Sequence, residues 1–341
     1  MAATKELHDA GQSIWLDYIT RDAVNDGTIE RYIDELSLTG LTSNPTIFDN
    51  ALAAGESYDA QTSELLAAGK SGEELFFELA LTDLRGACDL FAPVYERTDG
   101  ADGFCSLEVS PLLARDTEAT TAEAARLHAA AGRDNLFIKI PGTPEGLQAI
   151  EDTIAAGTPV NVTLLFDAQQ YLAQAEAYMR GVERRIEAGL DPNVPSVASL
   201  FVSRWDVAVS GKVPEELENR LGSAVAIDGY VAYRELLESD RWLRLENEGA
   251  RPQRYLFAST GTKDPALPKT KYVDDLAAPL SVNTMPEETL LALAEKEHIG
   301  PLLPADGGDN AALLEEFRGA GLELAALAKQ LQDEGAEKFV K

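Results

Sequence analysis

A single lysine interrupts one of the most apolar stretches of the chain. Residues 135–142 read NLFIKIPG, so Lys139 has hydrophobic neighbours typical of a parallel strand buried on both faces. Removing water from an ammonium group costs several kcal/mol, roughly, unless a partner compensates or the group loses its proton. A deprotonated lysine attacks carbonyl carbon and forms a Schiff base, which accepts electrons when a carbon–carbon bond breaks. This chemistry requires no metal and no cofactor.

Other polar residues interrupt or follow apolar runs at matching depths. Those that interrupt a run or end it are Asp17, Asn44, Glu108, Asn161 and Thr163, and those at or after the sixth and seventh runs are Ser199, Arg204, Ser259 and Lys263. In a parallel barrel they would gather at the C-terminal ends of the strands. Two carboxylates can then divide proton transfers, hydroxyls and amides suit sugar hydroxyls, and two cations suit a phosphate. We therefore expect a phosphorylated polyhydroxy ketone as the substrate.

Each of these residues also has a structural interpretation. An Asp or Asn at a strand end is commonly a helix N-cap, and a serine there can bond to backbone. Lys139 could form a purely structural ion pair with Glu108 or Asp17. Arg204 could form a surface ion pair with Asp206. The coincidence of six polar interruptions favours a catalytic site, because a core selected only for packing would hold Val, Ile or Leu there.

The elements that must position these residues can be read from apolar runs bounded by turn residues. Eight such runs begin at Ser13, Gly40, Gly103, Asn135, Pro159, Ser196, Arg254 and Leu280. Between them lie segments with helical periodicity, such as 120–132, which ends in glycine, and 167–189, which begins with a capping Asp167. Eight strands alternating with helices predict an α/β fold, a (β/α)8 TIM barrel.

The length of the chain leaves room for additions to such a barrel. The protein has 341 residues, whereas a simple barrel needs roughly 250. The range 207–248 is helical in composition and predicts an insertion after strand six, and the range 287–341 predicts a C-terminal helical cover. No repeat, low-complexity segment or linker marks a boundary, so we expect a single domain, 1–341.

Composition excludes several classes of function. The 58 acidic and 29 basic residues give a formal charge of −29, which would repel nucleic acid and anionic membrane. Cys88 and Cys105 have no CxxC or Cys–His spacing, so we expect neither a disulfide nor a metal site. The histidines, expected at surface or capping positions, argue against a Ser-His-Asp triad. The N-terminal segment has no signal-peptide core, and a cytoplasmic protein is expected.

Eight short motifs occur in order between residues 13 and 286. They read SIWLDYITR, GLTSNPTIF, CSLEVSP, LFIKIPGTPEG, VNVTLLF, ASLFVSRWD, FASTGTK and SVNTMP. Together they resemble the transaldolase family, in its longer bacterial form, over most of the chain. The resemblance implies transfer of a dihydroxyacetone unit from sedoheptulose 7-phosphate or fructose 6-phosphate to glyceraldehyde 3-phosphate or erythrose 4-phosphate. Such a reaction belongs to the non-oxidative pentose phosphate pathway.

The resemblance also assigns roles to individual residues. It implies that Lys139 forms the Schiff base and Asp17 is the proton-transfer acid and base. The residues implied to hold a catalytic water are Glu108 and Thr163, those implied to bind the dihydroxyacetone part are Asn44, Asn161 and Ser199, and those implied to contact phosphate are Arg204 and Ser259. Many members carry a second phosphate-binding arginine after strand seven, where this sequence has STGTK. Lys263 is the nearest cation, and because lysine is a point charge rather than a fork, we expect Arg204 to contribute more.

Two other functions remain open from the sequence. A related fructose-6-phosphate aldolase would use the same lysine but release dihydroxyacetone; that family is much shorter and lacks the predicted insertion and C-terminal helices. A catalytically silent barrel that binds sugar phosphates or a protein partner is a third interpretation, which the presence of Lys139, Asp17 and Glu108 disfavours. The oligomeric state is open, and a homo-oligomer is compatible with the family.

Overall fold

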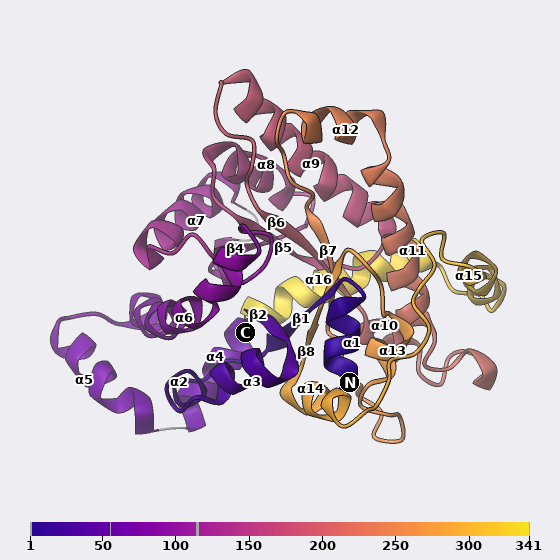
Figure 1. The fold of residues 1–341 in the computed structure, drawn as a ribbon, viewed down its shortest axis with the longest axis horizontal. Coiled ribbons are helices and arrows are strands. Elements are labelled where there is room, and N and C mark those ends of the chain that lie inside the picture. Colours follow the sequence, from indigo (N-terminus) through magenta and orange to yellow (C-terminus); the bar gives the residue numbers. More distant parts are fainter. Residues whose placement is uncertain (1, 55, 114–115, 341) are drawn as a thin grey trace.

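Eight parallel strands close into a barrel in which each strand pairs with its sequence neighbours and β8 pairs with β1 (Figure 1). The structure is a computed structural model that describes residues 2–54, 56–113 and 116–340. The strands are β1 Gln12–Asp17, β2 Leu38–Thr42, β3 Cys105–Glu108, β4 Leu136–Pro141, β5 Val160–Leu165, β6 Ser196–Phe201, β7 Arg254–Ala258 and β8 Ser281–Met285. All eight overlap the predicted apolar runs, so the predicted TIM barrel is confirmed.

Helices surround the barrel and cover its two ends. Within the described residues the α-helices are α1 Ala3–Asp9, α2 Arg21–Asn25, α3 Thr28–Leu36, α4 Pro45–Ala54, α5 Asp59–Ala67, α6 Gly72–Arg97, α7 Thr117–Ala131, α8 Gly146–Ala156, α9 Ala168–Glu187, α10 Ser203–Val209, α11 Leu221–Leu237, α12 Asp240–Asn247, α13 Lys271–Asp275, α14 Glu287–Ala294, α15 Asn310–Gly319 and α16 Leu324–Val340. Short 3-10 helices are η1 Glu56–Tyr58, η2 Pro111–Leu113 and η3 Glu215–Leu217.

Local sequence signals set the ends of the best-predicted helices. The Asp167 side chain accepts a hydrogen bond from the Gln170 amide at 2.7 Å, which satisfies one free N–H in the first turn of α9. At the C-terminal end of another helix, α7, Gly132 has a φ of 61°. This is a left-handed conformation that glycine adopts without strain. Both boundaries confirm the expectations from sequence.

The helical range 207–248 contains both a regular barrel helix and additional elements. Helix α11 packs against β6, β7 and the neighbouring α9, so it is the helix that connects strands six and seven across the outside of the barrel. Helices α10 and α12 precede and follow it. The additions at this point of the chain are therefore α10, η3 and α12, arranged around the sixth barrel helix.

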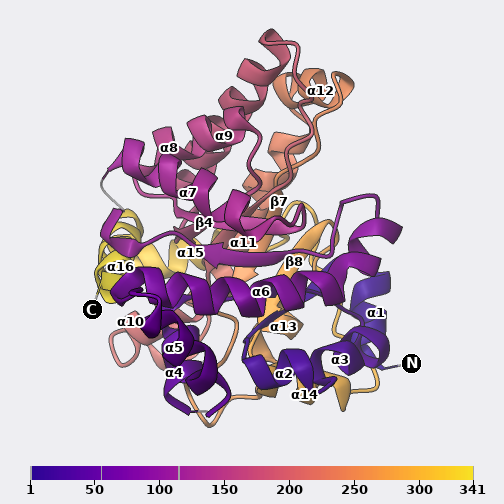
Figure 2. The ribbon, with the colours of Figure 1, turned by 90° about the vertical axis from the view of Figure 1, so that its left-hand side faces the viewer.

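Three helices of the described chain form the C-terminal region 287–340. Helix α14 packs beside α1, α15 packs on α11, and α16 contacts β5 and η2. Figure 2 shows α1 and α16 on opposite sides of the molecule. Helix η2 directly follows the C-terminal end of β3. Because α16 contacts η2 as well as β5, it lies at the barrel end where catalytic groups are expected.

The interior of the barrel changes from apolar to polar along the strands. Its N-terminal half holds large buried rings, among them Trp15 and Phe137, whose centroids are 6.1 Å apart. A Cβ at Gly40 would lie 2.5 Å from Trp15 Nε1, so only glycine leaves room for the indole. Two residues further along the same strands, the side chains on this face are Asp17 and Lys139. Polar groups therefore occupy the C-terminal mouth above an aromatic base.

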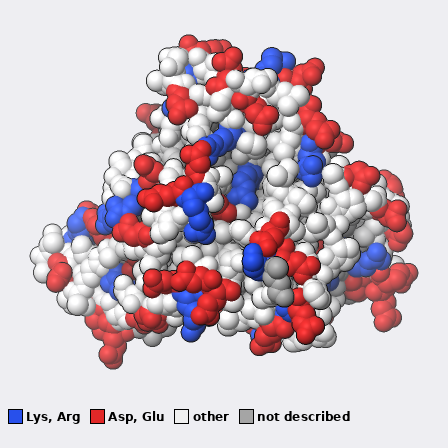
Figure 3. All heavy atoms as spheres, in the orientation of Figure 1, with Lys and Arg blue, Asp and Glu red and all other residues white. Residues whose placement is uncertain are grey.

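On the face shown in Figure 3, acidic side chains are spread out rather than concentrated in one patch. Figure 3 shows Asp and Glu across the visible face, with Lys and Arg between them and a hollow near its centre. In the described residues, no helix is both long and apolar enough to cross a membrane.

Candidate active site

The register of β3 and β4 places Lys139 beside a carboxylate. Glu108 and Lys139 are paired positions on these neighbouring strands. Lys139 Nζ lies 3.3 Å from Glu108 Oε2 and donates a hydrogen bond to the Ser43 carbonyl at 3.1 Å. The lysine side chain is only 7% exposed, yet it reaches the pocket at the barrel mouth. The ion pair proposed as a structural alternative is thus present, but it lies at a cavity that a substrate can enter.

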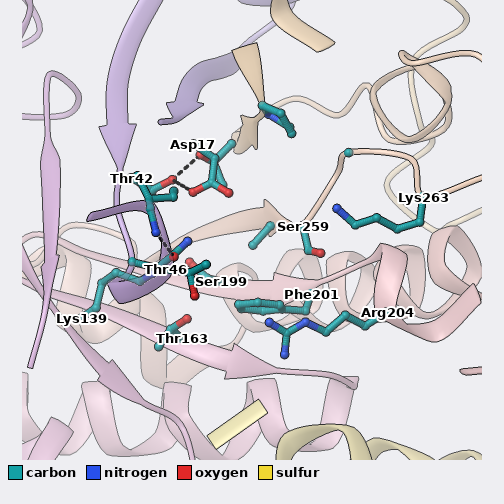
Figure 4. Close-up of a pocket in the computed structure, with 16 residues that line it drawn as sticks. Asp17, Thr42, Thr46, Lys139, Thr163, Ser199, Phe201, Arg204, Ser259 and Lys263 are labelled. Carbon is teal, nitrogen blue, oxygen red and sulfur yellow. Dashed lines mark hydrogen bonds between the residues drawn. The ribbon is translucent and has the colours of Figure 1, made fainter. Parts of the chain in front are cut away.

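Asp17 ends β1 on the same mouth and accepts a hydrogen bond from the Thr42 hydroxyl, which in turn contacts Thr284. Thr42 Oγ1 donates to Asp17 Oδ1 at 2.9 Å and lies 2.6 Å from Thr284 Oγ1 (Figure 4). Because the Thr42 proton points to Asp17, the Thr284 hydroxyl is the donor of the second bond. Burial raises the pKa of Asp17, while the charge of Lys139 and the Thr42 bond act in the opposite direction. A raised pKa suits a carboxyl group that must both accept and return a proton.

Glu108 and Thr163 contribute buried oxygens that have no hydrogen-bond partner among the described residues. Burial raises the pKa of Glu108, while the positive charge of Lys139 opposes this rise. Within the described residues, Glu108 Oε2 and Thr163 Oγ1 are buried and have no hydrogen-bond partner, because the contact of Glu108 to Lys139 is an ion pair without hydrogen-bond geometry. Their strands, β3 and β5, lie on either side of β4. Buried oxygens of this kind suit a bound water.

Two of the three predicted hydroxyl-binding residues, Asn161 and Ser199, form a chain of hydrogen bonds with Ser106 across three strands. Ser199 Oγ donates to Asn161 Oδ1 at 2.7 Å, and Asn161 Nδ2 donates to Ser106 Oγ at 3.1 Å. Asn44 has a second role, since its Oδ1 accepts from the Ile47 amide at 3.0 Å in the first turn of α4. The N-cap alternative is therefore correct for Asn44, and its side chain still lines the pocket.

The two predicted cations lie at the opposite end of the pocket from Lys139. Figure 4 shows Arg204 and Lys263 on one side and Lys139 on the other. The Arg204 guanidinium lies 4.7 Å from the centre of the Phe201 ring, a cation–π contact. Burial lowers the pKa of Arg204, while the carboxylates of Glu108 and Glu334 oppose this effect.

The surface ion pair considered for Arg204 does not form. Asp206 is buried and accepts hydrogen bonds from Gly222 N at 3.0 Å and from Tyr272 OH at 2.7 Å. Arg204 instead lines the pocket, because it is the second residue of α10 and this short helix begins immediately past β6. Ser259, at the end of β7, has a φ of 56° and its hydroxyl lies 2.9 Å from Ser203 Oγ.

These groups surround a pocket of about 290 Å³. The predicted residues that line it are Asp17, Asn44, Lys139, Thr163, Ser199, Arg204, Ser259 and Lys263. Glu108 and Asn161 lie behind this lining, in contact with Lys139 and Ser199 respectively. The structure therefore brings all ten predicted residues to one site.

Sequence reasoning missed other residues of the pocket. They are Thr42, Thr46, Ile47, Phe201, Ala258, Gly261, Thr284 and Pro286. Thr42 and Thr284 carry a signal that was available, since they lie in the motifs GLTSNPTIF and SVNTMP. Each follows an inward residue, Gly40 or Val282, by two positions and therefore points to the same face of its strand. The apolar members carry no such signal, because apolar residues at strand ends are ordinary packing residues.

No metal centre accompanies the site in the part of the chain that the structure describes. Residues 2–54, 56–113 and 116–340 contain no group of three or more His, Cys, Asp or Glu side chains able to hold an ion. His8, His128 and His298 all lie outside the lining of the pocket. The groups that line or support the mouth are an amine, two carboxylates, hydroxyls, amides and two cations.

Comparison with known proteins agrees with this chemistry. The model of the family described as "Transaldolase/Fructose-6-phosphate aldolase" matches residues 14–341. The chain belongs to this family. A protein named "Transaldolase" from Thermobifida fusca (strain YX) is 45% identical over 346 residues, which cover 99% of this chain and 94% of that protein. The transaldolase of Kocuria rhizophila is 44% identical, and the match covers 98% of this chain and 94% of that protein. The transaldolase of Trichodesmium erythraeum is 40% identical, and the match covers 98% of this chain and 93% of that protein. The predicted family and enzyme class, transaldolase, are confirmed.

Proposed function

We propose that this transaldolase-family enzyme transfers a dihydroxyacetone unit from a ketose phosphate to an aldose phosphate through a Schiff base on Lys139. The donor is sedoheptulose 7-phosphate or fructose 6-phosphate, and the acceptor is glyceraldehyde 3-phosphate or erythrose 4-phosphate. The observation that carries the proposal is the position of Lys139 Nζ, which lines the pocket 3.3 Å from Glu108 Oε2 with Arg204 and Lys263 at the far end. A sugar phosphate then places its carbonyl at the amine and its phosphate at the cations.

The first stage forms the imine. Glu108 accepts a proton from the Lys139 ammonium, and the free amine attacks the substrate C2 carbonyl to give a carbinolamine. A water bound by Glu108 and Thr163 relays a proton to the carbinolamine hydroxyl, which leaves as water and creates the iminium ion. The buried oxygens of Glu108 and Thr163, which have no hydrogen-bond partner among the described residues, support this assignment.

The second stage breaks the bond between C3 and C4. Asp17 removes the proton of the C4 hydroxyl, the aldehyde forms, and the bonding electrons move into the iminium to give an enamine on Lys139. The aldose phosphate leaves, the acceptor aldehyde enters, and the enamine attacks its carbonyl carbon. Asp17 returns the proton to the new hydroxyl, and hydrolysis of the imine releases the product. The raised pKa of Asp17, caused by burial, supports its role on both sides of this exchange.

Substrate recognition is divided between the two ends of the pocket. Asn44, Asn161 and Ser199 bind hydroxyls of the dihydroxyacetone part. Arg204 and Ser259 bind phosphate, and Lys263 adds a second positive charge. The small volume of the site, about 290 Å³, suits a sugar phosphate of this size. Since such sugars are metabolites of the cell interior, a cytoplasmic location is part of the proposal.

A coupled assay with fructose 6-phosphate tests the proposal. The enzyme is expected to turn over only when erythrose 4-phosphate is present as acceptor. Turnover without acceptor would assign the aldolase reaction instead, in which free dihydroxyacetone is released. Absence of turnover, together with absence of a covalent adduct after borohydride reduction, would leave only the silent barrel.

A further inference from the structure

Arg204 lies against the backbone of the C-terminal helix at a glycine. A Cβ at Gly335 would lie 3.0 Å from Arg204 Nη1 and 2.9 Å from Leu164 Cδ2. Such distances are too short for relaxed contact, so the guanidinium occupies space that any other residue at this position would fill. Figure 4 shows the yellow C-terminal helix beside the Arg204 end of the pocket. Together with the Phe201 ring at 4.7 Å, the helix restricts where the guanidinium can be.

Glycine at position 335 lowers the stability of the C-terminal helix. Gly335 lies inside α16, which runs from Leu324 to Val340. Glycine within a helix destabilises it by roughly 0.5–1 kcal/mol relative to alanine. Alanine would therefore be the better helix former, but its Cβ would force the ends of the Arg204 and Leu164 side chains to shift. Residues that break a local rule in this way concentrate at functional sites.

Gln332, one turn before Gly335 on the same face, fixes the helix at the barrel mouth. It is 4% exposed, and its Nε2 donates to the carbonyls of Gly142 at 3.1 Å and Leu164 at 3.0 Å. Leu164 has a φ of 60°, and the pairing of β5 shifts between Val162 and Leu165. This irregularity removes Leu164 from the strand ladder, and its carbonyl is bonded by the helix instead. The two hydrogen bonds join α16 to the strands that carry Lys139 and Thr163.

We propose that α16 supports the phosphate subsite from behind Arg204: Gly335 leaves room for the Arg204 guanidinium, and Gln332 holds the helix so that this room is maintained. The proposal rests on the proposed function, in which Arg204 binds phosphate. It makes Gly335 and Gln332 positioning residues that determine the preference for phosphorylated sugars. Neither is assigned a step in the chemistry at Lys139.

The test compares Gly335→Ala with Gly319→Ala. Gly319 ends α15, and a Cβ there would meet no atom within 4 Å, so it controls for the general effect of replacing a helical glycine. Gly335→Ala is expected to raise KM for fructose 6-phosphate by about 3- to 30-fold, less than complete loss of a charged hydrogen bond. Its kcat/KM for unphosphorylated fructose is expected to stay unchanged, because the groups around Lys139 are not altered. Its urea midpoint is expected to change little, because the higher helix propensity of alanine offsets the cost of shifting the Arg204 and Leu164 side chains. Gly319→Ala is expected to leave KM unchanged.

A second pair of variants tests the hydrogen bonds of the helix. Gln332→Leu is expected to produce the same phosphate-specific rise in KM, whereas Gln330→Leu is expected not to. Gln330 is on the same helix but is exposed and bonds to Glu334 at 2.7 Å. A loss in Gly335→Ala that is equal for fructose and fructose 6-phosphate, or no loss, would overturn the proposal.

Arg204→Ala separates this proposal from the function on which it depends. If Arg204→Ala shows a phosphate-specific defect and Gly335→Ala does not, the supporting role assigned to α16 is wrong and the phosphate site is right. If Arg204→Ala shows none, the phosphate site itself is misplaced and both proposals fail. In the Arg204→Ala background, Gly335→Ala is expected to add no further rise in KM, since the group it displaces is gone.

Discussion

Lys139 Nζ and Glu108 Oε2 lie 3.3 Å apart because the two residues are paired across β3 and β4. Both side chains are nearly excluded from solvent, with exposures of 7% and 3%. The pair therefore provides a proton acceptor directly beside the amine that must lose a proton before it can attack a carbonyl. Asp17, Arg204 and Lys263 complete the site around this pair.

Replacing Glu108 with glutamine should slow imine formation. Glutamine keeps the shape of the side chain but cannot take the Lys139 proton, so we expect a loss of roughly 10²- to 10⁴-fold, as for other general bases. The measurement is the rate at which a borohydride-trapped adduct accumulates after mixing with fructose 6-phosphate. An adduct that accumulates at the wild-type rate would show that Glu108 has only a structural role.

Asp17→Asn should reduce turnover while still permitting some imine formation. The amide retains an oxygen for the Thr42 hydroxyl, whose bond to Asp17 is 2.9 Å, but it cannot accept the C4 hydroxyl proton. The expected loss is roughly 10²- to 10⁴-fold in kcat. Steady-state turnover and adduct trapping are measured in parallel. Loss of both to the same degree would place Asp17 in imine formation rather than in bond cleavage.

The same substitution should increase stability at neutral pH. Burial raises the pKa of Asp17 above its usual 3.8, so between the unfolded and folded pKa values the native state binds more protons than the unfolded state. The wild-type free energy of unfolding consequently falls as pH rises through that window. An asparagine side chain cannot ionise, so the Asp17→Asn variant lacks this loss. Urea unfolding at pH 7 should give a larger free energy of unfolding for the variant than for the wild type, and this difference should shrink as the pH approaches 3.8. A difference that grows toward low pH would contradict the account.

Arg204→Ala should affect phosphorylated donors selectively. Removing a charged hydrogen-bond partner costs about 1.5–3 kcal/mol, roughly a 10- to 150-fold loss in kcat/KM. Activity on unphosphorylated fructose should change little, because the lost group lies at the far end of the pocket from Lys139. Lys263→Ala, assayed in the same way, should have the smaller effect, since lysine offers a single point charge. The reverse order would make Lys263 the principal phosphate ligand.

The strands, and the position of the candidate site residues at one barrel mouth, could be predicted from sequence because both depend on local pattern. An apolar run predicts a buried strand, and Lys139 is recognisable as an exception within such a run. Asp17, Asn161 and Thr163 could be placed at one mouth because parallel strands in a barrel all end on the same side. These inferences do not require the residue-by-residue pairing of neighbouring strands to be known.

Contacts between distant segments were not readable. The choice of Glu108 rather than Asp17 as the ion-pair partner of Lys139 depends on the register of β3 with β4. Likewise, the contact of Gly335 with Arg204 depends on how α16 crosses the barrel mouth. A glycine in a helical segment and an arginine after a strand carry no joint signal in a single sequence, because their proximity is set by tertiary packing.

Borohydride reduction followed by peptide mass spectrometry tests the central claim most directly. The wild-type enzyme, incubated with fructose 6-phosphate without acceptor and then reduced, should carry one three-carbon adduct on the peptide that contains Lys139. Lys139→Arg should carry no adduct and show no turnover, because a guanidinium cannot form the imine. An adduct on another lysine, or turnover by Lys139→Arg above about one percent of wild type, would contradict the assignment of Lys139 as the Schiff-base residue.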